Sequence, residues 1–258
     1  MGKVIKNILR LKENNQKAIA ILIDPDNLSR EFLVKQVELA KINSVDFFFV
    51  GGSMITDDCL EETIDYIKSN CDIPAVIFPG SVNQVSNKAD AILFLSLISG
   101  RNPDLLIGNH VLSAPRIQKT GIEVIPTGYM LIDGGKPTAA SYVSNSFPIP
   151  NDKPKIARVT ALAGEMLGLR LNFLDAGSGA VKKVSQEMIR ATAQGTSNPL
   201  IVGGGIKTSE GAKEAWSSGA TVVVIGNAIE NDPNIIKEVS KIKIQLNENN
   251  CVIPAKIN

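Results

Sequence analysis

The 258-residue sequence has very few of the residues on which many metal and redox sites depend. His110 is its single histidine, and its three cysteines have no CxxC spacing and no histidine pair near them. A zinc centre or a Ser-His-Asp triad would therefore have little to draw on. An odd number of scattered cysteines is typical of reduced thiols, so we expect a cytoplasmic protein.

The charge and hydropathy patterns argue against two further classes. The 27 basic and 26 acidic residues almost cancel, which indicates neither a nucleic-acid groove nor a polybasic membrane patch. The longest apolar runs, such as 18–23 and 221–225, are far shorter than the roughly 18–20 residues of a membrane span. No apolar segment follows the first lysines, so no signal peptide is visible. We expect no nucleic-acid partner and no membrane span, although a lipid substrate could bring the protein to a membrane surface.

Short apolar segments alternate with longer segments of helical period along the chain. Strands are expected at 18–23, 45–50, 74–78, 91–97, 123–131, 171–174, 200–202 and 221–225. Helices are expected at 29–42, 57–69, within 103–119, and at 155–168, 185–194, 209–218 and 233–245. Residues 83–88 offer only a short helical turn, and 133–154 form a long loop. Strands that are apolar throughout are typical of a parallel sheet covered by helices. The pattern predicts a single α/β domain over residues 1–258, a (β/α)8 TIM barrel modified by a weak or missing third helix.

Glycine and polar residues recur where the predicted strands end. In a barrel these ends meet at one face, which carries the active site. Gly203–Ile206 follows the seventh strand and Gly226–Asn227 follows the eighth. Loops at these two places often bind phosphate, because glycine lets backbone N–H groups approach the anion. Thr208 and Ser209 are candidate caps of the next helix. We expect a phosphorylated small substrate there, although the same glycines also suit tight turns.

Carboxylates stand at the ends of the first and sixth strands. Asp24 and Asp26 flank a proline after the first strand, and Ser53 follows the second. Oxygen ligands of this kind suit Mg²⁺, which also bridges to substrate phosphates, although Asp26 equally suits a turn or helix cap. Asp175 stands where a general base would face the barrel mouth, with a structural turn as the alternative. His110 lies on a predicted helix, where a packing role is more common than a catalytic one.

The strand-end motifs, taken in order, resemble geranylgeranylglyceryl phosphate synthase. The matching runs are Ile23–Asp26, Val50–Ser53, Phe78–Gly80, Leu174–Gly179, Gly203–Ile206 and Gly226–Asn227. Each motif alone is weak, but their order and spacing over about residues 18–227 are specific. The resemblance implies an enzyme of ether phospholipid biosynthesis on a modified barrel. It would use Mg²⁺ to join a polyprenyl diphosphate to the hydroxyl of sn-glycerol 1-phosphate. The resemblance also implies a homo-oligomer.

The resemblance further implies particular site residues. Asp24 and Ser53 would bind Mg²⁺, and Asp175 would orient or deprotonate the acceptor hydroxyl. The residues that would bind glycerol 1-phosphate are Phe173, Leu174, Asp175, Ala176, Gly177, Ser178, Gly179, Gly204, Gly205, Gly226 and Asn227. The sequence departs from the Tyr-Leu-Glu common in archaeal members. Phe173 lacks the phenol, and Asp175 is one methylene shorter than glutamate.

A prenyl donor also requires an apolar groove, because each buried CH₂ contributes about 0.8 kcal/mol. Leu95, Leu97, Ile98 and Tyr129, on or after the fourth and fifth strands, are candidates to line it. Two other functional hypotheses stay open. One is a different phosphate-binding barrel enzyme, either an isomerase, a lyase or a flavin enzyme. The other is a non-catalytic barrel that binds a phospholigand or a lipid. The sequence does not indicate the length of the prenyl chain.

Overall fold

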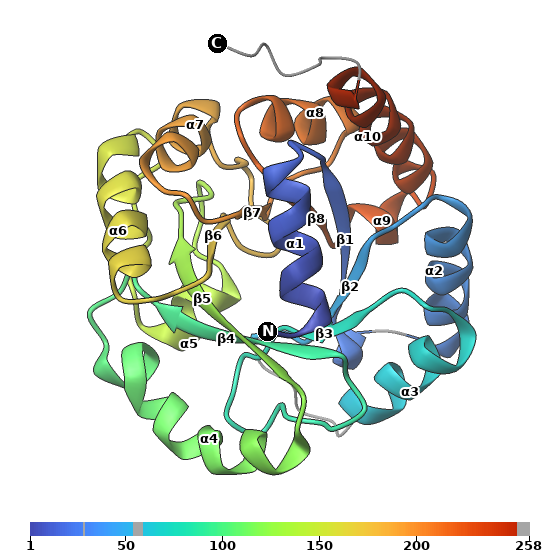
Figure 1. Ribbon diagram of the computed structural model, residues 1–258, viewed down its shortest axis with the longest axis horizontal. Coiled ribbons are helices and arrows are strands. Elements are labelled where there is room, and N and C mark those ends of the chain that lie inside the picture. The colour runs from blue at the N-terminus through green and yellow to red at the C-terminus, as the bar shows by residue number, and fades with distance from the viewer. Residues whose placement is uncertain (28, 54–58, 252–258) are drawn as a thin grey trace.

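The computed structural model describes residues 1–27, 29–53 and 59–251, and eight parallel strands close into a barrel within them (Figure 1). Each strand pairs with the next along the chain, and β8 pairs with β1. The strands are β1 Ala18–Ile23, β2 Phe47–Val50, β3 Ala75–Ile77, β4 Ala91–Leu97, β5 Glu123–Leu131, β6 Leu171–Asp175, β7 Leu200–Gly203 and β8 Val222–Ile225. The predicted (β/α)8 barrel is confirmed.

An outer ring of helices surrounds the strands (Figure 1). Its long members are α2 Arg30–Ile42, α3 Leu60–Asn70, α4 Asn109–Thr120, α6 Pro154–Met166, α7 Gln186–Gly195, α8 Ser209–Ser217 and α10 Ile235–Cys251. These bounds agree closely with the predicted ones, except that α10 ends six residues later. The helix predicted at residues 57–69 corresponds to α3, and its expected first two residues, 57 and 58, lie outside the described residues. Residues 78–90, all described, form turns and no helix, which confirms the missing third helix.

Three further helices were not predicted: α1 Lys3–Glu13, α5 Ala139–Ser144 and α9 Ala228–Asn231. The segment expected to be a long loop contains α5, whose start is fixed by a capping box between Thr138 and Ser141. Short helices such as α5 and α9 have no long apolar period, so hydropathy alone does not reveal them.

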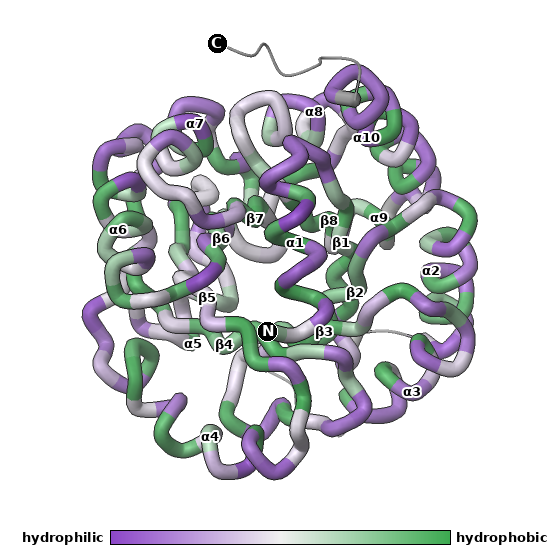
Figure 2. The backbone as a smooth tube through the Cα atoms, viewed as in Figure 1, coloured by the Kyte–Doolittle hydropathy of each residue, from purple (hydrophilic) through white to green (hydrophobic). Residues whose placement is uncertain are grey.

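Apolar side chains form two core layers, one inside the barrel and one between the strands and the helices. In β2, Phe47 and Phe49 fill the interior, whereas Phe48 packs in the outer layer. Figure 2 shows hydrophobic residues along the strands, and hydrophilic residues that alternate with hydrophobic ones on the outer helices. Both faces of each strand are covered, which explains why the strands read as continuous apolar runs.

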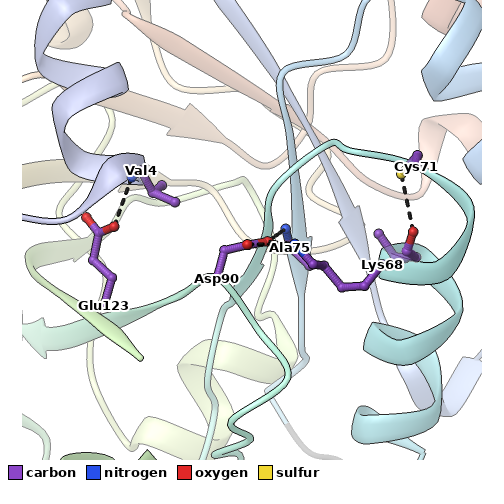
Figure 3. A network of polar contacts seen from close by, with 7 residues as sticks. Val4, Lys68, Cys71, Ala75, Asp90 and Glu123 are labelled. Carbon is purple, nitrogen blue, oxygen red and sulfur yellow. Dashed lines mark hydrogen bonds and ion pairs between the residues drawn. The ribbon is translucent and has the colours of Figure 1, made fainter. Parts of the chain in front are cut away.

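Helix α1 lies across one end of the barrel (Figure 1) and packs Val4, Ile5, Ile8 and Leu11 into the inner layer. The carboxylate of Glu123, the first residue of β5, accepts a hydrogen bond from the backbone N–H of Val4 at 2.9 Å (Figure 3) and another from that of Ile5 at 2.8 Å. A carboxylate stabilises the positive end of a helix dipole. Because Glu123 begins its strand, α1 covers the N-terminal end of the barrel, and the C-terminal end is left for the site.

Asp90 ties the short connection between β3 and β4 to its neighbours. Its carboxylate accepts from the backbone N–H of Ala75 at 2.8 Å and from Nζ of Lys68 at 2.6 Å (Figure 3). These contacts join the starts of β3 and β4 to α3. The connection is thereby fixed without a helix of its own, and the outer face of β4 stays open to α4.

Candidate active site

A large cavity of about 690 Å³ begins at the C-terminal ends of the strands. Polar residues and glycines line that part of it, namely Asp24, Gly52, Ser53, Asp175, Ser178, Gly226 and Asn227. The cavity continues between β4 and α4, where its lining is mainly apolar: Val82, Val85, Ile92, Phe94, Leu105, Ser113 and Ile117. It thus occupies the space that a third helix would otherwise cover. One continuous cavity therefore joins a polar mouth to an apolar channel.

Most of the residues expected to line an apolar groove do so. Leu95, Leu97 and Tyr129 line the large cavity, but Ile98 does not. The end of the Ile98 side chain lies instead close to Gly128 and Gly164, in the space that their missing side chains leave. Ile98 packs against the outer core layer, whereas Leu95 and Leu97 belong to the inner one, so alternation between the two faces of the strand turns Ile98 away from the cavity.

His110, on α4, also lines the channel and contacts the ring of Phe94 edge-on, with ring centroids 4.3 Å apart. Burial lowers the pKa of His110, so the ring is held in its neutral form. A neutral imidazole packed on phenylalanine fits the expected packing role.

A small cavity of about 60 Å³ lies beside the mouth, between the loops that follow β6, β7 and β8. Its lining is Phe173, Asp175, Gly177–Ala180, Gly203–Lys207 and Gly226–Ala228, together with Leu22, Phe78 and Val224. Since one water occupies about 30 Å³ in the liquid, the cavity has room for a group of a few heavy atoms. The two predicted glycine loops therefore meet the Asp175 loop around one small space.

Glycine is required where these loops touch. Gly204 has a φ of +76°, and a Cβ placed on it would lie 2.5 Å from the backbone nitrogen of Gly177. Ser178 Oγ donates to Asn227 Oδ1 at 2.6 Å, which links the β6 and β8 loops. The three loops thus support one another.

Two lysines near the small cavity were missed from the sequence. Lys207 lines it, and Nζ of Lys136 lies 3.8 Å from the place of a Cβ on Gly179. The position of Lys207 directly after a glycine loop could have indicated its place at the cavity, whereas Lys136 is distant in sequence from the loops.

Two helices begin beside the small cavity. Thr208 caps α8 as expected, because its side chain accepts from the Gly211 N–H at 3.1 Å. The short helix α9 begins at Ala228, which lines the cavity.

The strand period divides the residues of the β6 segment between the two core layers. Phe173, Asp175, Gly177, Ser178 and Gly179 line the small cavity, whereas Leu174 and Ala176 are buried in the outer core layer. Side chains at these two positions point away from the site, as alternation along a strand requires. Gly204, Gly205, Gly226 and Asn227 all line the small cavity.

Asp175 is the point at which the two cavities meet, because its side chain lines both. It is only 8% exposed. Its Oδ2 accepts from the Tyr129 hydroxyl at 2.6 Å and its Oδ1 from the Gly177 N–H at 2.7 Å. Burial raises the pKa of Asp175, while these two hydrogen bonds act in the opposite direction. Burial, with the neighbouring carboxylate, also raises the pKa of Tyr129 well above its usual value, so the phenol keeps its proton.

On the other side of the mouth lie Asp24 and Ser53. A Cβ on Gly52 would lie 3.0 Å or less from the Asp24 carboxylate, so the β2 loop passes directly over that carboxylate. Asp24 Oδ1 accepts from the Asp26 N–H at 3.3 Å, and Ser29, not Asp26, caps α2.

Residues 1–27, 29–53 and 59–251 contain no cluster of three or more histidine, cysteine, aspartate or glutamate side chains that could hold a metal ion. A single carboxylate and a hydroxyl nevertheless fit Mg²⁺, which completes its shell with substrate phosphates and water.

The model of the PcrB family matches residues 11–243 of this chain. The chain belongs to the PcrB family. Two curated relatives are both geranylgeranylglyceryl phosphate synthases. The one from Chitinophaga pinensis is 50% identical over 239 residues, which are 93% of this chain and 95% of that protein. The one from Pyrococcus horikoshii is 42% identical over 231 residues, 89% of this chain and 90% of that protein.

A solved structure extends the match of this PcrB-family chain to three dimensions. It is the (S)-3-O-geranylgeranylglyceryl phosphate synthase of Thermoplasma acidophilum in complex with its substrate sn-glycerol-1-phosphate. The TM-score is 0.89 at 34% identity, and the match covers 95% of this chain and 100% of that one. The resemblance drawn from the strand-end motifs is confirmed. Among the helices of residues 1–27, 29–53 and 59–251, none is long and apolar enough to cross a bilayer.

Proposed function

We propose that this PcrB-family protein transfers a polyprenyl group from its diphosphate to the hydroxyl of sn-glycerol 1-phosphate, in a Mg²⁺-dependent reaction that forms an ether. The observation that carries the proposal is the meeting of a small glycine-lined cavity and a long apolar cavity at one carboxylate, Asp175. An acceptor phosphate and a lipid donor need two such spaces side by side. The named relatives support the same activity.

The small cavity suits the acceptor. Its glycines expose backbone to the ligand, and Lys207 adds a positive charge for a phosphate. A phosphate held there would leave the glycerol part to extend toward Asp175, the residue shared with the large cavity. We assign to this cavity the predicted acceptor residues that line it, from Phe173 to Asn227.

The large cavity suits the donor. Its apolar channel between β4 and α4 would take the prenyl chain, each buried CH₂ contributing about 0.8 kcal/mol. The diphosphate would lie at the polar mouth, near Asp24 and Ser53. Those two residues would hold Mg²⁺, which supplies charge neutralisation for the leaving diphosphate.

Asp175 would accept the proton of the acceptor hydroxyl. The oxygen of that hydroxyl forms a bond to the allylic carbon of the donor while the bond from that carbon to the diphosphate oxygen breaks. Diphosphate leaves with the bonding electron pair. Holding the two reactants in neighbouring cavities contributes to the rate, because attack becomes effectively intramolecular.

The test is an extraction assay with labelled sn-glycerol 1-phosphate, Mg²⁺ and donors from ten to thirty-five carbons. We expect a labelled glyceryl ether with at least one donor, and much less from sn-glycerol 3-phosphate. If no donor gives an ether, the proposal is wrong. A flavin absorption spectrum of the purified protein would favour the other class of barrel enzyme.

We also propose that the chain is one domain that forms a homo-oligomer and reaches a membrane surface to obtain its donor. Large apolar side chains are exposed on and beside α4 and α5, namely Ile107, Val111, Leu112, Tyr142 and Phe147, the last of them 95% exposed. Such patches are typical of interaction sites. Light scattering after size exclusion tests self-association, and flotation with lipid vesicles tests membrane contact. A monomer at all concentrations would contradict the first, and protein left in the dense fraction would contradict the second.

A further inference from the structure

Asp175 receives its side-chain hydrogen bond from a strand other than its own. Tyr129 of β5 pairs in register with Phe173 of β6, and Leu131 pairs with Asp175. Tyr129 therefore stands two residues before the position opposite Asp175, on the same inward face. Diagonal neighbours of this kind lie within reach of a long aromatic side chain. The phenol spans that gap and donates to Asp175 Oδ2 at 2.6 Å.

The ring of Tyr129 is fixed by aromatic packing. Its centroid lies 5.4 Å from that of Phe173 and 5.8 Å from that of Phe78, both in edge-on contact. Phe78 and Phe173 stack on each other with centroids 5.3 Å apart. The phenylalanine that replaces the tyrosine of the archaeal pattern thus packs against the very ring that carries the phenol.

The other elements around Asp175 offer its carboxylate little else. Its own loop supplies the Gly177 N–H, and the β7 loop brings Gly204, which has no side chain. Among the described residues, the recorded hydrogen bonds give Asp175 no side-chain donor other than Tyr129. Without the phenol, a buried carboxylate oxygen would lose its partner and the carboxylate would be free to turn.

We propose that Tyr129 is a positioning residue, which holds the Asp175 carboxylate at the junction of the two cavities and supplies the phenol that Phe173 lacks. The inference rests on the proposed function, because the carboxylate must face an acceptor hydroxyl. A short aspartate held by a neighbouring strand then replaces the longer glutamate of the archaeal pattern. Both departures of this chain, Phe173 and Asp175, have one structural explanation.

The test compares Tyr129→Phe with the wild type and with Tyr66→Phe, which removes a phenol on α3. We expect Tyr129→Phe to lower kcat about 10- to 100-fold, the range of one hydrogen bond to a charged group, with little change in KM for the acceptor. The hydrogen bond favours the ionised carboxylate, so its loss raises the pKa of Asp175 further. The acidic limb of kcat/KM should therefore move to higher pH, a change that a purely structural role would not produce.

A double-mutant cycle with Asp175→Asn completes the design. If Tyr129 acts through Asp175, the double variant is no slower than Asp175→Asn alone. Effects that multiply, or a Tyr129→Phe enzyme with wild-type kcat and pH limb, would overturn the inference. Should Tyr129→Phe fold poorly, 3-fluorotyrosine in place of Tyr129 keeps the ring, and its more acidic phenol should move the limb to lower pH. An unmoved limb would again overturn it. Absence of ether formation by the wild type would instead count against the proposed function.

Discussion

Gly204 lies directly against the carboxylate of Asp175. A Cβ on Gly204 would stand 2.7 Å from Asp175 Oδ1 and 2.5 Å from the backbone nitrogen of Gly177. The loop that would hold the acceptor phosphate and the group that would accept its proton are therefore in van der Waals contact. Under the proposed function, phosphate binding and proton transfer would therefore take place at one corner of the barrel mouth.

We expect Gly204→Ala to raise the KM for the acceptor at least about 10-fold, because the new methyl group forces the β6 and β7 loops apart. Its positive φ adds a conformational cost of about 1 kcal/mol. The matched control is Gly121→Ala. Gly121 has a φ of +69° but nothing within 4 Å of its Cβ position. The control should lose stability without losing acceptor affinity; equal KM values in the two variants would contradict the contact argument. Steady-state kinetics and urea unfolding measure the two effects.

Asp24→Asn keeps the size of the side chain but removes its charge. We expect kcat/KM to fall about 100-fold or more, and the Mg²⁺ concentration for half-maximal rate to rise, because a neutral amide is a weak magnesium ligand. Asp26→Asn is the matched control, since Asp26 lines neither cavity. A magnesium titration of the rate checks both variants. An Asp24→Asn enzyme with the wild-type magnesium dependence would show that Asp24 is not a metal ligand.

Lys17 provides a pH-dependent test of the fold. Burial, and secondarily the charge of Lys12, lowers the pKa of Lys17 from 10.5 to about 8. Below pH 8 the folded protein buries a charged amine. Between pH 8 and 10.5 the folded state loses that proton while the unfolded state keeps it, so this cost declines. We therefore expect Lys17→Met to raise the free energy of unfolding near neutral pH, and the gain to shrink by about pH 10.

Urea unfolding at the two pH values measures this difference, with Lys35→Met on the exposed side of α2 as the control. A gain that is constant or grows with pH would contradict the assigned pKa direction.

Glu123→Gln tests how α1 is held over the barrel. The neutral amide keeps one acceptor oxygen, so one of the two backbone N–H groups, of Val4 or Ile5, loses its acceptor and the other bonds an uncharged oxygen. We expect the free energy of unfolding to fall by about 1–3 kcal/mol, with faster hydrogen exchange in α1. Glu38→Gln, exposed on α2, is the control. Unchanged exchange in α1 would mean that its apolar face alone holds it in place.

Much of the fold can be predicted from local patterns in the sequence. Apolar runs such as Phe47–Val50 have covered faces on both sides, and this requirement makes a parallel barrel predictable. The spacing of Val4, Ile5, Ile8 and Leu11 is amphipathic, so α1 too is predictable from its sequence. No local pattern, however, could show that this helix covers the barrel end, because its anchor Glu123 is more than a hundred residues away.

The sequence by itself determined the order of the strands and which residues stand at their C-terminal ends, since chain order fixes barrel order and glycine and aspartate mark the loops. Only the tertiary structure decided how those residues meet. It placed Asp175 between two cavities and gave it a phenol from β5. The physical reason is that cavities and hydrogen bonds between strands depend on barrel closure and register, which bring together positions that sequence spacing does not relate.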